Sequence, residues 1–126
     1  MELKAGQIIT VDWRKDPEDP AQDPHPPEPN KLRPAVVVQD TDLLDPSYPT
    51  VLAVPMTGDR ELVMADLTVV LQPTAKNGCK KVSYLVPQNL TCVAKTRITE
   101  ATDSHISTEQ LQQLRQLIVL LIGALT

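Results

Sequence analysis

Aromatic side chains are scarce in this chain of 126 residues, which has one Trp, two Tyr and no Phe. Stacking on aromatic rings is the usual sequence-tolerant way to hold single-stranded nucleic acids, and three rings cannot build an extended stacking surface. Any recognition of bases would have to depend on hydrogen bonds, with the two tyrosines, Tyr48 and Tyr84, as the candidates for stacking.

Several signals of common protein classes are also missing. Cys79 and Cys92 form no C-x-x-C pair and match no zinc spacing, so we expect reduced thiols and no metal. The longest uncharged apolar run, residues 117–125, is about half of what a bilayer span needs. The first residues show no signal-peptide pattern, and no Walker loop or dinucleotide fingerprint is present. We therefore expect one cytoplasmic domain, residues 1–126, with no membrane contact and no cofactor.

Positive charge is not in excess, since the formal net charge is −4. The acidity is concentrated in residues 16–30, which hold five acidic residues, no Lys or Arg, and half of the chain's twelve prolines. Proline cannot donate to a strand ladder, so this segment is predicted to be a long exposed loop. The remainder of the chain is close to neutral, which permits a site for RNA without requiring one.

Short apolar runs predict a sheet. Alternation over residues 7–13 is typical of a half-buried strand. Further strands are expected at 35–39, 50–54, 67–71 and 82–86, whereas 90–94 could be a sixth strand or a short helix. Asn77-Gly78 favours a hairpin turn. Because no helical pattern separates these runs, we expect a mainly β (α+β) fold, a small antiparallel barrel followed by a C-terminal helix.

The predicted helix spans about residues 107–125. Ser107 and Gln110 form a capping-box pattern, and leucine and isoleucine then recur at helical spacing. Additional apolar residues at positions 117, 119, 120 and 122 widen the apolar surface beyond one stripe. A homodimer that shares the helix would cover them, and so would a helix end wrapped within the same monomer.

Two motifs place polar groups next to strands. Arg33 precedes Pro34, which suits the first position of a strand and favours an extended backbone at the arginine. Its planar guanidinium matches the two free oxygens of a phosphodiester. Thr57 precedes Gly58 at the end of an apolar run, so its hydroxyl is expected at a sheet rim. A surface Arg paired with a carboxylate, and a Thr that caps a turn, are the structural alternatives.

The order of Gly6-Gln7-Ile8, Arg33-Pro34 and Thr57 resembles the MazF/PemK (Kid-like) endoribonuclease toxins of type II toxin–antitoxin systems. The resemblance implies an SH3-like barrel, a homodimer, an antitoxin peptide as partner, and cleavage of single-stranded RNA that leaves a 2′,3′-cyclic phosphate and a 5′-hydroxyl. It also implies that Arg33 stabilises the phosphorane and that Thr57 holds the scissile phosphate.

This sequence departs most from the family pattern at the residue that would transfer protons. Family members carry a catalytic His or Glu between their first and second strands, which suggests His25, with Glu28 as the alternative from the same loop. Lys31 would add attraction for phosphate, or would be an ordinary surface lysine. Pro87 stands where the family usually has an acid before its Gln, and Gln88 would bind RNA or complete a turn.

Three functions are therefore open. The first is an active endoribonuclease toxin. The second is a non-catalytic relative that keeps the barrel to bind an antitoxin-like partner, which the missing acid and the acidic loop suggest. The third, a gyrase poison of the CcdB type, is less favoured because residues 123–126 contain no Trp.

Overall fold

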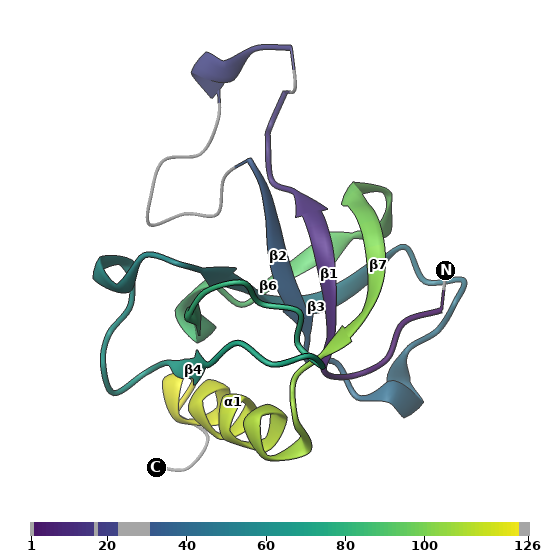
Figure 1. Ribbon diagram of the computed structural model, residues 1–126. Helices are drawn as coiled ribbons and strands as arrows, with labels where there is room; N and C mark the ends of the chain where they lie inside the picture. Colours follow the sequence, from purple (N-terminus) through teal and green to yellow (C-terminus); the bar gives the residue numbers. More distant parts are fainter. Residues whose placement is uncertain (1, 17, 23–30, 124–126) are drawn as a thin grey trace.

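The computed structural model describes residues 2–16, 18–22 and 31–123, in which a seven-stranded antiparallel sheet packs against one C-terminal helix (Figure 1). The strands are β1 (Gln7–Asp12), β2 (Leu32–Val37), β3 (Thr50–Thr57), β4 (Val69–Leu71), β5 (Ser83–Leu85), β6 (Thr91–Ala94) and β7 (Ile98–His105). The helix is α1 (Thr108–Leu121). Short 3-10 turns are η1 (Pro20–Gln22), η2 (Thr41–Leu43), η3 (Arg60–Leu62), η4 (Pro87–Asn89) and η5 (Lys95–Arg97).

Strand β3 joins the two parts of the sheet. On one side it pairs with β2, in the order β3-β2-β1-β7. On its other side, its first half pairs with β6 and its last two residues, Met56 and Thr57, pair with β5, which in turn pairs with β4. The apolar sequence of β3, buried at five of its eight positions, fits this central place because both of its faces are covered.

Alternation along the strands supplies two hydrophobic clusters, one on each face of the sheet. One cluster lies between the sheet and α1 and includes Ile8, Val36, Leu85 and Leu114. The other contains residues from β1, β2, β3, β6 and β7 that point to the opposite face: Ile9, Val11, Ala35, Val37, Val51, Ala53, Val93 and Ile98, together with Leu3. The strand residues that solvent can reach are therefore those outside the two clusters.

The sheet is not closed into a barrel. Among the described residues no ladder joins the edge strands β4 and β7. The segment that connects β4 to β5 contacts β7 instead. The His105 N–H donates to the Lys76 carbonyl at 2.9 Å, and Gly78 lies against the Ser104 side chain. The prediction of a mainly β antiparallel fold is confirmed, with loop contacts where a closed barrel would have a strand pair.

The strand predictions were correct in place and imprecise in length. β2 begins at Leu32, so Arg33 and Pro34 lie within it, and residues 91–94 are a strand. Asn77-Gly78 does not form a two-residue hairpin, because it lies within the long connection between β4 and β5. The sequence prediction missed β7, whose polar residues carry almost no hydrophobic alternation. Its ladder with β1 is reinforced by side chains, such as Thr102 Oγ1 donating to the Ile8 carbonyl at 2.6 Å.

Helix α1 begins as predicted, with the Ser107 and Gln110 capping box formed in both directions. Arg115 donates two hydrogen bonds to the Val38 carbonyl, at 3.1 and 2.9 Å, and so fastens the helix to the end of β2. Beyond this point Leu120 and Ile122 are exposed, so the described part of the monomer does not cover the whole apolar surface of the helix. No helix among the described residues has the length and hydropathy to cross a membrane.

We expect Gly78→Ala to destabilise the protein. Gly78 has φ +66°, a conformation that costs a residue with a side chain about 1–2 kcal/mol, and its new Cβ would lie 2.7 Å from Ser104 Oγ. In a Ser104→Ala background the substitution should cost less, since the collision is removed while the backbone strain remains. Urea unfolding of the four proteins tests this, and an equal cost in both backgrounds would contradict the bridging contact.

Candidate functional site

The ladder between β2 and β3 relates the two residues that the sequence singled out. Its pairs include Ala35 with Pro55, and β2 continues for two further residues to Arg33 as β3 continues to Thr57. Continued by two residues along each strand, the same register would bring Arg33 opposite Thr57. Residues opposite each other in an antiparallel pair share a face. Both lie on the face that carries the second cluster, at the end of the sheet away from that cluster's centre.

Arg33 is exposed near the start of β2. It pairs in register with Val11 of β1, and the following Pro34, which has no N–H, pairs with Thr10. The guanidinium belongs to a rigid strand rather than to a loop, and it can reach a ligand from solvent. A fixed cation with several donors on such a scaffold suits an anion with two oxygens, such as a phosphodiester.

Thr57 is partly exposed as the last residue of β3. Its Oγ1 accepts a hydrogen bond from the Asp59 N–H at 3.1 Å, so the hydroxyl does cap the turn that follows. This bond uses an oxygen lone pair and not the hydroxyl proton. The proton can still be donated to an acceptor such as a phosphate oxygen. The turn-capping role and a binding role are thus compatible.

Lys81 is a candidate that the sequence reasoning did not identify. Its Cε and Nζ lie 2.6 and 2.8 Å from the point where a Cβ would stand on Gly58. Gly58 does not have a positive φ, so space rather than backbone conformation explains the glycine here. The absence of a side chain lets the lysine ammonium lie against the turn that follows Thr57. The only sequence feature that pointed to this contact was the glycine that follows Thr57.

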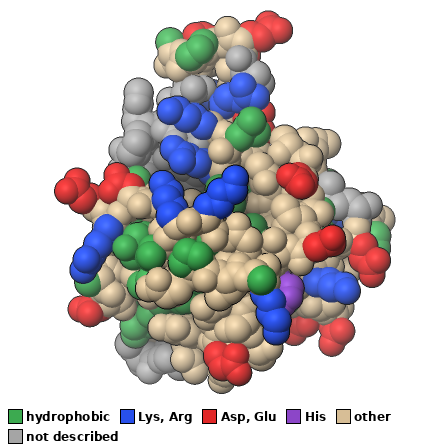
Figure 2. Space-filling model, viewed as in Figure 1, with side chains coloured by type: hydrophobic (Ala, Val, Ile, Leu, Met, Phe, Trp, Pro, Cys, Tyr) green, Lys and Arg blue, Asp and Glu red, His purple; other side chains and the backbone are tan. Residues whose placement is uncertain are grey.

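Basic side chains gather on one face of the molecule. In the view of Figure 2, Lys and Arg side chains cross the upper middle of the molecule, while most Asp and Glu side chains lie at its edges. The net charge of −4 therefore does not describe this face. Local positive charge attracts phosphates, because the potential near a surface follows the nearest charges.

Lys31 is exposed and has φ 61°, an uncommon conformation for a residue with a side chain. Its carbonyl accepts from the Trp13 N–H at 2.8 Å, which holds the backbone where the chain enters β2. Its side chain is two residues before Arg33 in the chain. His25 and Glu28, the predicted proton-transfer residues, lie outside the described residues.

Gln88 is exposed in η4, which packs against α1 and β3. In the chain it lies four residues beyond Tyr84, the partner of Thr57, and therefore farther along the sheet from the row that contains Arg33. The preceding Pro87 is buried at the first position of η4. No carboxylate takes its place in this turn.

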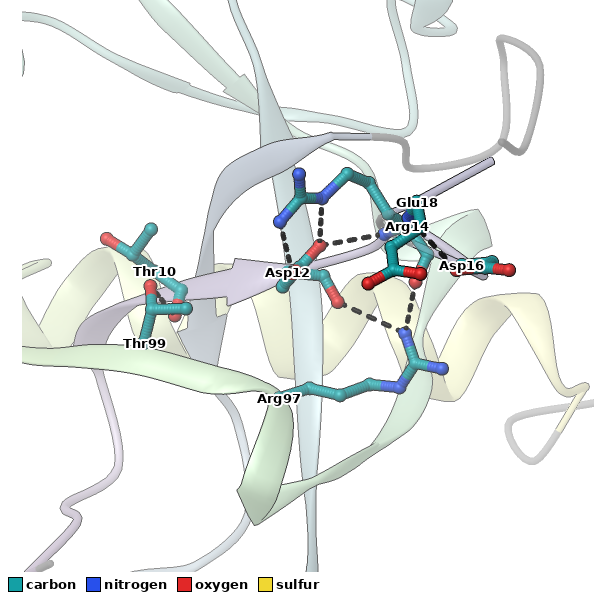
Figure 3. A network of polar contacts seen from close by, with 7 residues as sticks. All are labelled: Thr10, Asp12, Arg14, Asp16, Glu18, Arg97 and Thr99. Carbon is teal, nitrogen blue, oxygen red and sulfur yellow. Dashed lines mark hydrogen bonds and ion pairs between the residues drawn. The ribbon is translucent and has the colours of Figure 1, made fainter. Parts of the chain in front are cut away.

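A polar network fixes the end of β1 beside β2 (Figure 3). Arg14 binds the Asp12 carboxylate through two nitrogens, at 2.9 and 2.8 Å. Arg97, from η5, donates to the backbone carbonyls of Asp12 and Arg14 at 3.2 and 2.9 Å. Because Asp12 pairs with Leu32, these bonds help to position the strand residue next to Arg33.

No cluster of His, Cys, Asp and Glu side chains that could hold a metal ion occurs within the described part of the chain. Cys79 and Cys92 are free cysteines. The groups that this surface offers are cations and a hydroxyl, which can bind a phosphate, withdraw charge from it and stabilise added negative charge.

Comparisons with known proteins agree on one family. A sequence model described as "PemK-like, MazF-like toxin of type II toxin-antitoxin system" matches residues 4–122. No curated protein sequence matches the chain. Among solved structures, the MazF (Form-I) crystal structure from Deinococcus radiodurans has a TM-score of 0.74 at 15% identity, with 98% of each chain covered.

Two mycobacterial structures are similar as well. An endoribonuclease in complex with its cognate antitoxin has a TM-score of 0.65 at 12% identity, over 97% of this chain and 94% of that one. The Mycobacterium tuberculosis toxin MazF-mt6 has a TM-score of 0.64 at 16% identity, over 92% and 95%. At these identities the likeness establishes a shared fold.

We expect Asp12→Asn to destabilise the protein in a pH-dependent way. Hydrogen bonds from the Arg14 side chain and backbone lower the pKa of Asp12 from 3.8 to about 2. Since the pKa is lower in the folded state, the ionised carboxylate stabilises the fold above pH 3.8. This stabilisation is lost as the pH falls through about 2.

Urea unfolding at a series of pH values checks this. At pH 7 the variant should unfold at a lower urea concentration than the parent, and the difference should shrink as the pH falls below 3.8. Asp66→Asn, which changes an exposed carboxylate, provides the control. A difference that does not vary with pH would show that the carboxylate charge is not involved.

Proposed function

Because the chain belongs to the PemK-like, MazF-like toxins of type II toxin–antitoxin systems, we propose that it is an endoribonuclease that cleaves single-stranded RNA without a metal ion. The proposal is supported by the β2–β3 register, whose last printed pair is Ala35 with Pro55 and which, continued by two residues along each strand, would bring the exposed Arg33 opposite the partly exposed Thr57. A guanidinium and a hydroxyl on adjacent rigid strands suit the binding of one phosphodiester. Because its substrate would be cellular RNA, we propose that the protein acts in the cytoplasm.

The proposed reaction is attack by a ribose 2′-oxygen on the adjacent phosphorus. The 2′-oxygen loses its proton to a base, the bond to the 5′-oxygen breaks, and that oxygen gains a proton. The products are a 2′,3′-cyclic phosphate and a 5′-hydroxyl. Negative charge increases on the non-bridging oxygens in the transition state, where the Arg33 guanidinium and the Thr57 hydroxyl would stabilise it.

The base is proposed from the loop between β1 and β2. His25 has an imidazole whose ordinary pKa suits proton transfer near neutral pH, and Glu28 is the alternative. Lys31 adds attraction for the RNA backbone at the end of this loop, and Gln88 supplies an amide for hydrogen bonds to a base. Thr57 itself is not the base, because its hydroxyl does not ionise near neutral pH.

We propose an antitoxin peptide as the protein partner, as suggested by the mycobacterial endoribonuclease that was solved with its cognate antitoxin. We also propose a homodimer through α1. The support for the dimer is an apolar groove of about 770 Å³ along the helix, which includes Leu117 and Leu120. Leu120 is 51% exposed and Ile122 is 70% exposed, and burial of the exposed part in a partner would stabilise such side chains by about 1–2 kcal/mol each.

A non-catalytic binding module is the second candidate function. The specific observation in its favour is Pro87, buried in η4 where the family pattern has an acid. If proton transfer needed that acid, the protein would bind its antitoxin and would not cleave RNA. Formation of a stoichiometric complex without cleavage under any condition would favour this function.

We expect Arg33→Ala to lose activity. Removal of one transition-state donor costs about 3 kcal/mol, which corresponds to a rate a few hundred-fold lower. The measurement is cleavage of a long purified RNA in EDTA by parent and variant. Arg33→Lys, which keeps the charge without the planar fork, should be intermediate, and Lys76→Ala, on the far loop, should cleave like the parent.

Equal cleavage by the Arg33→Ala variant would remove the arginine from the mechanism. Cleavage by the parent that stops in EDTA would contradict the metal-independent reaction. Analysis of the RNA ends provides a further check, since products without cyclic phosphates would rule out attack by the 2′-oxygen.

We expect Leu120→Glu to separate the proposed dimer. A carboxylate at this position would have to be buried without a partner, which is costly. Sedimentation at micromolar concentration should give a dimer for the parent and a monomer for the variant. Leu43→Glu, at a leucine of η2 that is 71% exposed, is the matched control and should remain dimeric. A dimer that persists in Leu120→Glu would show that the subunits associate through another surface.

A further inference from the structure

The row that contains Arg33 and Thr57 continues across two more strands. Thr57 pairs with Tyr84 of β5, and Tyr84 pairs with Val70 of β4. Residues that pair in this way share a face, so Thr57, Tyr84 and Val70 lie in one line on three adjacent strands, and the continued β2–β3 register would extend the line to Arg33. The tyrosine is thus the next side chain along the sheet from the proposed scissile phosphate.

A groove lies over the last two strands of this row. It has a volume of about 350 Å³, and its lining includes Arg60, Val63, Thr68, Val70, Val82 and Tyr84. The neighbouring residues of the same strands, Val69, Leu71 and Leu85, are buried on the opposite face. Alternation along β4 and β5 therefore forces the groove residues outward, onto the face of Thr57.

The chemistry of the groove matches one nucleotide. Tyr84 offers an aromatic ring and Val70 an apolar wall, which suit the flat face of a base. Arg60 carries a positive charge at the groove, and Lys81, next to the groove residue Val82 in the chain, lies against Gly58, the residue after Thr57. Ring, apolar wall and cations are what a nucleotide's base and phosphate require.

We propose that this groove is a nucleobase subsite for RNA. It holds a base adjacent to the cleaved linkage by stacking on Tyr84, while Lys81 binds the phosphate between that base and the linkage at Thr57. The inference rests on the proposed endoribonuclease function. In it, the RNA crosses the sheet from β2 over β3 toward β4.

The test uses a short random-sequence RNA in which every 2′-hydroxyl is methylated, so that the RNA binds without being cleaved. Tyr84→Leu should weaken binding about tenfold, since stacking on an aromatic side chain contributes this much per base. Tyr84→Phe keeps the ring and should bind like the parent. Tyr48→Leu, at the other tyrosine, which is 60% exposed, should also bind like the parent.

Salt dependence separates the role of the ring from that of the cation. For Lys81→Ala, the slope of log affinity against log salt should fall by about 0.7, the value for one phosphate contact of a single strand. For Tyr84→Leu the slope should not change, because stacking releases no counterions. Lys76→Ala serves as the control. Thermal melting identifies any variant whose fold is damaged.

Photo-crosslinking gives a readout that needs no variant. The same RNA with 5-iodouridine in place of uridine should form a covalent adduct with the parent protein at Tyr84, located by mass spectrometry. Adducts at Tyr48 alone, or unchanged affinity in Tyr84→Leu, would overturn the subsite while the RNA-binding function stood. If the parent protein neither bound nor cleaved RNA, the proposed function would fail, and the subsite with it.

Discussion

The pairing of β2 with β3 is the constraint on which the candidate site depends. The ladder places Ala35 opposite Pro55, and the buried alternation of both strands fixes the register. A slip by one residue would turn the apolar side chains outward and expose the cluster, which is a large cost for a small domain. The same slip would move Arg33 and Thr57 to different faces. Selection for a packed core therefore also maintains the relation between the two polar groups.

Pro34 and Gly58 shape the end of this ladder. Pro34 lacks the N–H that would continue the pairing with β3, and on its other side β3 pairs with β5 beyond Pro55. Gly58 then leaves the space that the Lys81 side chain occupies. The edge of the ladder is thereby open to solvent and carries cations. Neither residue has a polar side chain to bind substrate, yet a side chain at position 58 would displace the lysine.

Part of this arrangement could be predicted from the sequence. The places of Arg33 and Thr57 at strand ends and the cap of α1 could be predicted because each depends on neighbours in the chain, which motifs describe. β7 was missed because only its first residue, Ile98, is buried, and its ladder depends on side-chain bonds such as Gln7 Nε2 to the Thr102 carbonyl. The contact of Lys81 with Gly58, and the line from Thr57 to Tyr84, required the register between distant strands. No local pattern contains that information.

Because Pro87 stands where the family pattern has an acid, charge stabilisation and proton transfer would come from different parts of the site. A guanidinium keeps its positive charge in proteins, so Arg33 would stabilise negative charge well but would be a poor source of a proton. Thr57 can donate a hydrogen bond but cannot act as the base near neutral pH. The described groups therefore bind and stabilise, while proton transfer must come from the β1–β2 loop or from water. Stabilisation of charge and proton transfer both lower the barrier, so a site with only the first would bind RNA and cleave it more slowly than a site with both.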